Sequence, residues 1–93
     1  MKIEVIKKLN KNELEKKNIK NWPVWEKEPS SFDWHYECGE VCYVLKGRAV
    51  IKTIYQEVEI EEGDYVVFPA GMRCHWNIKE KFKKHYNFEK ENI

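Results

Sequence analysis

The sequence lacks the long apolar segments that membrane insertion and secretion require. No apolar run approaches the ~20 residues of a membrane-spanning helix. Residues 1–8 mix charged and aliphatic side chains and contain no apolar segment typical of a signal peptide. We therefore expect a cytoplasmic protein with no membrane partner.

Cysteine is scarce, and neither sign of charge is in excess. The three cysteines, Cys38, Cys42 and Cys74, are an odd number without C-x2-C spacing, so neither a disulfide framework nor a self-contained zinc site is predicted. Seventeen basic residues against 16 acidic ones leave a formal net charge of +1. This balance gives no electrostatic case for a nucleic-acid partner.

Apolar and aromatic side chains, by contrast, are frequent enough to build one core. They make up 42% and 14% of the chain, respectively. A chain of 93 residues is near the low end of the lengths at which a single hydrophobic core stabilises a domain without disulfide bonds or bound metal ions. We therefore predict one domain over residues 1–93.

The amino-terminal third predicts two short extended segments around one helix. Lys2–Lys8 alternates in the manner of an edge strand, with lysines at its end. Asn10–Lys17 offers asparagine caps, an acidic first turn and a basic end, which together favour a short helix anchored by Leu14. Trp22–Glu26 is predicted to be extended and at a sheet edge, because Pro23 disfavours helix at the preceding residue.

From Ser30 onward the pattern is that of an all-β fold. Phe32, Trp34 and Tyr36 alternate with polar residues, which is the period of a half-buried strand. Further strands are predicted at Glu40–Gly47, Arg48–Ile54, Tyr55–Ile60, Tyr65–Phe68, Arg73–Ile78 and Phe82–Phe88. Gly47 is predicted to be a hairpin turn, and Lys79–Lys81 a solvated turn between the last two strands. Eight or nine short strands at regular spacing indicate a double-sheet jelly roll.

Two segments carry the most specific spacing in the chain. One reads Glu40-x6-Gly47, and the other reads Gly63-x5-Pro69-x-Gly71. Together they resemble the paired signature of the cupin superfamily, G-x5-H-x-H-x(3,4)-E-x6-G followed by G-x5-P-x-G-x2-H-x3-N. The resemblance implies a cupin double-stranded β-helix, which is a jelly-roll barrel, here with one short amino-terminal helix.

The chain departs from that signature mainly at the histidines. Depending on the spacer, the H-x-H pair falls on Asp33 and His35 or on Trp34 and Tyr36, and Cys74 stands at the histidine of the second motif. Beyond the signature, the chain resembles the small single-domain, RmlC-like cupins of the ureidoglycine aminohydrolase and ethanolamine-utilisation type. The segments that carry this resemblance are Trp22–Glu28, Phe32–Trp34, Glu40–Tyr43, Phe68–Cys74 and Lys84–Tyr86, within a core of about residues 19–88.

The register of the motif strands predicts which side chains face the barrel interior. Residues of equal parity on a strand share a face, so in the cupin register Glu40 and Cys42 point inward, as do Cys74 and Trp76. On the strand before them, either the aromatic side chains or Asp33 and His35 face inward, and the sequence leaves both open. The predicted ligand pocket comprises Trp34, Tyr36, Glu40, Cys42, Phe68, Cys74 and Trp76.

The resemblance leaves two functions open. The main prediction is a protein that binds a small molecule of unknown identity inside the barrel, with or without a divalent metal, and with Glu40 and Cys74 as the candidate catalytic groups if a reaction occurs. The alternative is a metal-dependent enzyme acting on a small polar metabolite. Cupin enzymes hold Mn, Fe, Ni or Zn with two or three histidines and one glutamate, whereas this chain offers at best His35, Glu40 and Cys74.

The strand edges predict how the chain assembles. A jelly roll leaves edge strands open to pairing. The run Trp22–Trp25 is also more apolar than a free edge tolerates. We therefore predict a homodimer that forms through edge strands near the amino terminus.

Overall fold

A computed structural model describes residues 1–89 and confirms the all-β prediction. Its elements are β1 (Glu4–Ile6), α1 (Lys11–Lys16), a single 3-10 turn (Ile19–Asn21), β2 (Val24–Lys27), β3 (Ser30–His35), β4 (Glu40–Lys52), β5 (Glu57–Glu61), β6 (Tyr65–Phe68) and β7 (Arg73–Phe88). All strand pairs are antiparallel. Within residues 1–89, no helix is both long and apolar enough to cross a membrane.

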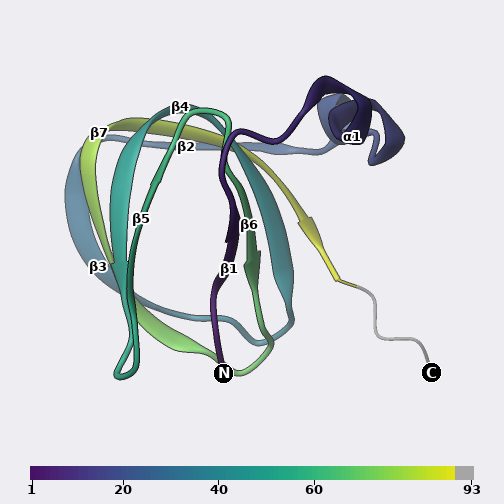
Figure 1. The fold of residues 1–93 in the computed structure, drawn as a ribbon. Coiled ribbons are helices and arrows are strands. Elements are labelled where there is room, and N and C mark those ends of the chain that lie inside the picture. The colour runs from purple at the N-terminus through teal and green to yellow at the C-terminus, as the bar shows by residue number, and fades with distance from the viewer. Residues whose placement is uncertain (90–93) are drawn as a thin grey trace.

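The two long strands, β4 and β7, form the ribbon around which the barrel is built. They pair along their whole length, from Glu40 opposite Phe88 to Lys52 opposite His75. At one end of this ribbon the strand order is β1-β6-β4-β7-β2, and at the other end β5 and β3 pair with its two outer edges. The ribbon curves so that these two ends face each other across the core (Figure 1).

The structure corrects both predicted turns within this ribbon. Gly47 does not end a strand: β4 runs through it for 13 residues, and β7 likewise runs for 16 residues through Lys79–Lys81. Between Val44 and Ala49 the pairing register shifts, and Gly47 has a φ of 88°. Such bulges bend a strand without interrupting it. The predicted hairpin turn is therefore the bend that carries one strand across both faces of the barrel.

Side chains close the gap between β1 and β5, and we call this region the β1–β5 seam. The side-chain amide of Gln56 receives a hydrogen bond from the Ile3 N–H at 2.9 Å and donates one to the Ile3 carbonyl at 3.0 Å. At the other end, the fully buried carboxylate of Asp64 contacts the Lys7 ammonium and accepts from the Glu61 N–H. The seam thus provides hydrogen-bond partners for backbone N–H and C=O groups that would have none on an unpaired strand edge.

The amino-terminal elements lie where the sequence predicts them. The side chain of Asn10 caps α1 by accepting from the Glu13 N–H at 2.9 Å. Leu14 is partly buried and packs with Ile19 against the outer side of the sheet at Val41. β1 and β2 are the edge strands of their sheet.

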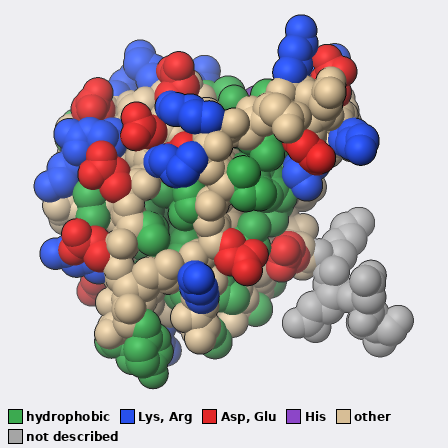
Figure 2. Space-filling model, in the orientation of Figure 1, with side chains coloured by type: hydrophobic (Ala, Val, Ile, Leu, Met, Phe, Trp, Pro, Cys, Tyr) green, Lys and Arg blue, Asp and Glu red, His purple; other side chains and the backbone are tan. Residues whose placement is uncertain are grey.

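The visible surface is mixed in charge and has one apolar projection. Acidic and basic side chains are interspersed over the face seen in Figure 2, as the net charge of +1 suggests. The hydrophobic group at the bottom of that view lies at the tip between β4 and β5, where Ile54 is 88% exposed and Tyr55 is 78% exposed.

Candidate functional site

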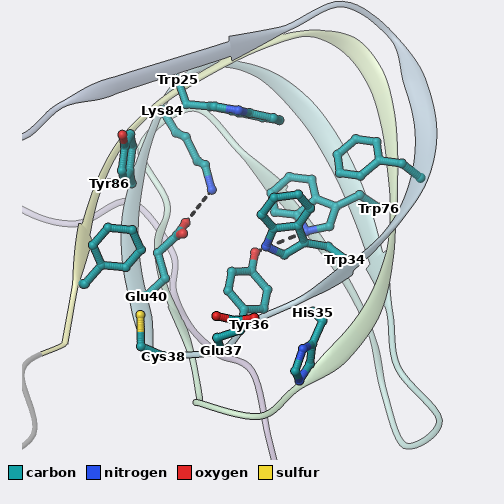
Figure 3. A pocket seen from close by; sticks show the side chains of 12 residues that line it. Trp25, Trp34, His35, Tyr36, Glu37, Cys38, Glu40, Trp76, Lys84 and Tyr86 are labelled. Carbon is teal, nitrogen blue, oxygen red and sulfur yellow. Dashed lines mark hydrogen bonds and ion pairs between the residues drawn. The ribbon is translucent and has the colours of Figure 1, made fainter.

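The barrel contains a cavity of about 620 Å³ whose walls are mainly aromatic. The aromatic lining residues are Trp25, Phe32, Trp34, Tyr36, Trp76, Tyr86 and Phe88. They come from β2, β3, β7 and the segment after β3, which together frame the mouth of the cavity (Figure 3). Protein pockets for small molecules typically measure about 300–1,000 Å³ and are lined mostly by apolar groups.

β3 settles the alternative that the sequence left open, because its aromatic side chains face the cavity. The Phe32 ring stacks on Trp76 with centroids 6.1 Å apart, and Trp34 meets Phe32 edge to face at 6.5 Å. Asp33 points to the outside, where its carboxylate lies 2.8 Å from Nδ1 of His75. The polar residues of β3 therefore do not belong to the interior.

A buried ion pair lies inside the cavity. Nζ of Lys84 donates to Oε2 of Glu40 over 2.6 Å, and the two side chains are 7% and 10% exposed, respectively. The side chains point toward each other from β7 and β4 (Figure 3). Charged side chains are rarely buried unless they are paired. This pair is therefore the main polar feature of an otherwise aromatic interior.

Lys84 is not among the pocket residues predicted from the sequence, although the pattern of β7 indicates that this lysine is unusual. Phe82, Lys84, Tyr86 and Phe88 share one parity on β7, so a lysine interrupts an otherwise apolar alternating face. A charged residue on such a face predicts either an exposed face or a buried partner. The partner, Glu40, lies 44 positions earlier in the chain.

Aromatic rings surround the ammonium group of Lys84. Its Nζ lies 5.0 Å from the ring centroid of Trp76, 5.2 Å from that of Trp25 and 5.9 Å from that of Phe68. A cation within about 6 Å of a ring face is stabilised by the quadrupole of the ring. The rings thus offset part of the cost of removing this charge from water.

Tyr36 provides a further polar group. Its hydroxyl oxygen accepts a hydrogen bond from Nε1 of Trp76 at 3.3 Å. Burial, followed by the charge of Glu40, raises the pKa of Tyr36 far above its usual value. The hydroxyl therefore keeps its proton, and in residues 1–89 no side-chain acceptor receives it. Tyr36 can act as a hydrogen-bond donor.

Three residues of the predicted pocket lie in the core behind the cavity instead of lining it. Cys42 and Phe68 are fully buried, and Cys74 is 7% exposed. Burial raises the pKa of Cys42 to about 12 and that of Cys74 to about 11, so both are thiols at neutral pH. Strand parity indicates the face of a side chain but not its depth. At Phe68, the Tyr36 ring stacks on the phenyl ring at 4.6 Å and the Trp76 ring lies 5.9 Å away.

The predicted metal ligands do not form a set that suits a divalent ion. Among residues 1–89, no group of three or more His, Cys, Asp or Glu side chains is gathered so as to hold a metal. Glu40 is occupied by the Lys84 ammonium, and Cys74 lies in the core instead of lining the cavity. His35 is exposed at the edge of the cavity, apart from the Glu40–Lys84 pair (Figure 3). The metal centre expected for a cupin enzyme therefore does not fit these residues.

Comparison with known families and structures gives a consistent result. The family model for the EutQ-like cupin domain matches residues 14–86. The crystal structure of a DUF861 family protein from Thermotoga maritima is 39% identical in sequence, with a TM-score of 0.90 over 95% of this chain and 100% of that chain. The structure of the Clostridium difficile EutQ protein is 20% identical, with a TM-score of 0.66 over 75% of this chain and 56% of that chain, which indicates a shared fold.

Curated relatives are much longer than this chain. A candidate dioxygenase of Saccharolobus solfataricus is 35% identical over 48 residues, which are 52% of this chain and 12% of that protein. The chain spans 18% of the length of a second curated relative. These matches therefore cover only a small part of each relative.

Proposed function

The chain belongs to the EutQ-like cupin domain family, and we propose that it binds a small organic molecule in the barrel cavity through its own side chains, without a metal ion. The ligand would lie between the aromatic walls and contact the Glu40–Lys84 pair. Tyr36 would supply a further hydrogen bond from the wall of the cavity.

The observation that carries this proposal is the burial of an ion pair beside an open cavity. Removing two charges from water costs free energy that their attraction often does not recover, and apolar residues of similar volume frequently stabilise a fold equally well or better. Stability alone is therefore a weak reason for placing Glu40 and Lys84 here. Directed polar groups in an aromatic pocket are what ligand recognition requires.

The proposal is tested by screening the purified protein against a library of small polar aromatic compounds with ligand-observed NMR. Bound compounds are expected to change tryptophan fluorescence, because three of the four tryptophans line the cavity. The double variant Glu40→Gln/Lys84→Met keeps the side-chain volumes but removes both charges, and it is expected to lose this binding.

Lys79→Met provides the matched control, since Lys79 lies on the same strand with an exposed side chain. It is expected to bind as the unmodified protein does. The proposal fails if no compound binds, or if the double variant binds every compound as well as the control does.

A further inference from the structure

We propose that the cavity selects uncharged planar ligands carrying a hydrogen-bond acceptor beside a donor, and that Glu40 and Lys84 set this preference as a balanced pair. This inference rests on the proposed function and narrows it to a ligand class. It follows from the charge, the hydrogen-bonding groups and the walls of the cavity.

The charge inside the cavity is balanced. Among the lining residues, the buried charged side chains are Lys84 and Glu40, one of each sign. Glu37 and His35 also border the cavity, but both are exposed at its rim. A charged ligand would leave a net charge among the aromatic rings, and an unpaired charge in such surroundings is costly. An uncharged ligand avoids this cost.

The ion pair places a donor and an acceptor side by side. The Lys84 ammonium has three N–H groups, and Oε2 of Glu40 takes one of them over 2.6 Å. The second carboxylate oxygen of Glu40 accepts no other side-chain bond within residues 1–89. A carbonyl oxygen can thus receive a bond from Lys84 while an adjacent N–H donates to Glu40. The Tyr36 hydroxyl can supply a second donor to the carbonyl oxygen.

The walls of the cavity favour a flat ligand. Trp34 and Phe88 line the mouth and are each 52% exposed, although both are large and apolar. Tyr86 meets Phe88 edge to face at 5.9 Å, and Trp34 meets Tyr36 at 6.5 Å. Exposed aromatic rings grouped around a cavity are typical of a binding site. A planar molecule would cover these ring faces without disturbing their packing.

Three probes of nearly equal shape separate charge from the other properties: benzamide, benzoate and benzamidinium. Their affinities are measured at neutral pH by ligand-observed NMR titration. The unmodified protein is expected to bind benzamide about tenfold or more tightly than either ion. Benzoate or benzamidinium binding as tightly as benzamide would overturn the inference.

Variants of the pair are expected to reverse the preference in opposite directions. Lys84→Met leaves the carboxylate of Glu40 unpaired, so benzamidinium should become the preferred probe. Glu40→Gln leaves the ammonium unpaired, so benzoate should become preferred. The exposed-residue controls Lys79→Met and Glu62→Gln change the net charge of the protein by the same amounts and should leave the order of affinities unchanged. Single variants that keep the preference for benzamide would also overturn the inference.

The double variant keeps the test independent of folding. Each single variant leaves a buried charge without its partner and is expected to lower the melting temperature, whereas Glu40→Gln/Lys84→Met leaves an uncharged interior. The double variant should remain folded by circular dichroism and favour neither ion over the other. A double variant that prefers one ion by about tenfold would show that other groups set the selectivity.

Failure of the inference can be distinguished from failure of the proposed function. If none of the three probes binds the unmodified protein while the library screen yields a ligand that needs the pair, this ligand class is wrong and the proposed function stands. If neither the probes nor the library bind, both are wrong.

Discussion

Trp76 connects more of the cavity wall than any neighbouring side chain described above. Its ring lies 6.1 Å from Phe32, 6.2 Å from Trp25 and 5.5 Å from Phe82, and its N–H donates to Tyr36. It is 2% exposed. One side chain therefore joins β2, β3 and the middle of its own strand, β7, and positions Tyr36 in the cavity wall.

Replacing this residue should be costly. Trp76→Ala is expected to lower the free energy of unfolding by about 3–5 kcal/mol, because truncating a buried aromatic residue leaves a cavity. Urea denaturation measures the change. Tyr55→Ala, at a residue that is 78% exposed, serves as the control and should cost under about 0.5 kcal/mol. A loss under about 1 kcal/mol for Trp76→Ala would contradict its role in packing.

Cysteine labelling tests the burial of Cys74. In native protein we expect a thiol reagent to modify the exposed Cys38 rapidly and Cys74 slowly, since Cys74 is 7% exposed and burial raises its pKa to about 11. Cys42, which is fully buried, should react only on unfolding. Mass mapping after timed labelling gives the three rates. Native modification of Cys74 as fast as that of Cys38 would contradict this assignment.

For individual residues, the sequence predicted the position of a single side chain more reliably than the contact between two side chains on different strands. Glu40 could be identified from its spacing to Gly47, and the inward direction of Trp76 from strand parity. Lys84 could not be identified in the same way, since its role depends on a carboxylate on another strand. Cys42 and Cys74 were predicted to line the pocket, but both lie in the core, because strand parity gives the face of a side chain and not its depth.

Among the secondary-structure elements, β4 shows how a bend is built into a continuous strand. At Gly47, an added Cβ would lie 2.1 Å from the carbonyl oxygen of Lys81 on β7. The backbone there also has a φ of 88°, which side chains rarely tolerate. At this bend, the backbones of β4 and β7 therefore approach so closely that only glycine, which has no Cβ, fits at position 47.

Gly47→Ala is expected to destabilise the protein by about 2–4 kcal/mol, combining the strain of a left-handed conformation with a backbone clash. Gly71→Ala is the matched control. It has a similar φ of 83°, but its new methyl group would meet only the flexible end of Met1 at 3.1 Å. Gly71→Ala should therefore cost about 1–2 kcal/mol. Equal losses in urea denaturation would mean that the approach of β7 is not what requires glycine at position 47.

The two mistaken turns have a common physical origin. Glycine with a positive φ marks both turns and bulges, so Gly47 on its own does not distinguish them. Lys79–Lys81 is polar enough for a loop, but polar side chains are equally acceptable on the solvent side of a strand. Only the continuous pairing of β4 with β7 decides, and that pairing joins residues far apart in the sequence.

For the molecule as a whole, buried thiols should make stability depend on alkaline pH. Burial raises the pKa of Cys42 from 9.0 to about 12 and that of Cys74 from 9.0 to about 11; Lys84 opposes both shifts, while Glu40 adds to both and Asp33 to that of Cys74. The unfolded chain therefore loses these protons at lower pH than the folded one. The stability that the two thiols contribute should be fully retained below about pH 9 and fall as pH rises through about 11 for Cys74 and about 12 for Cys42.

Urea denaturation over this range measures the effect. A Cys42→Ala/Cys74→Ala variant should show a shallower fall above pH 9 than the unmodified protein, because it lacks the two thiols. Identical slopes for the two proteins would mean that other groups control alkaline unfolding. The variant also leaves small cavities, so its absolute stability is compared only with its own value at neutral pH.

Assembly remains a prediction, and the structure narrows where it should occur. The β1–β5 seam covers one edge near the amino terminus. In residues 1–89, β2 pairs only with β7, and Val24 on it is 45% exposed. We expect a homodimer through β2, observed by sedimentation as a species of twice the 11.3 kDa chain mass. Val24→Lys should yield monomers, while Ile54→Lys, at an exposed apolar position elsewhere, should not. A monomer at high concentration would refute this prediction.

The position of β7 in the chain has a consequence for synthesis on the ribosome. β2, β3 and β4 all pair with β7, yet β7 follows each of them in the sequence. Until Arg73–Phe88 has emerged, β2 and β3 have no strand to pair with, and Glu40 has no Lys84. The nascent chain therefore cannot complete its seven-stranded sheet or its ion pair before β7 is made. The barrel and its aromatic cavity are therefore complete only once β7 is available.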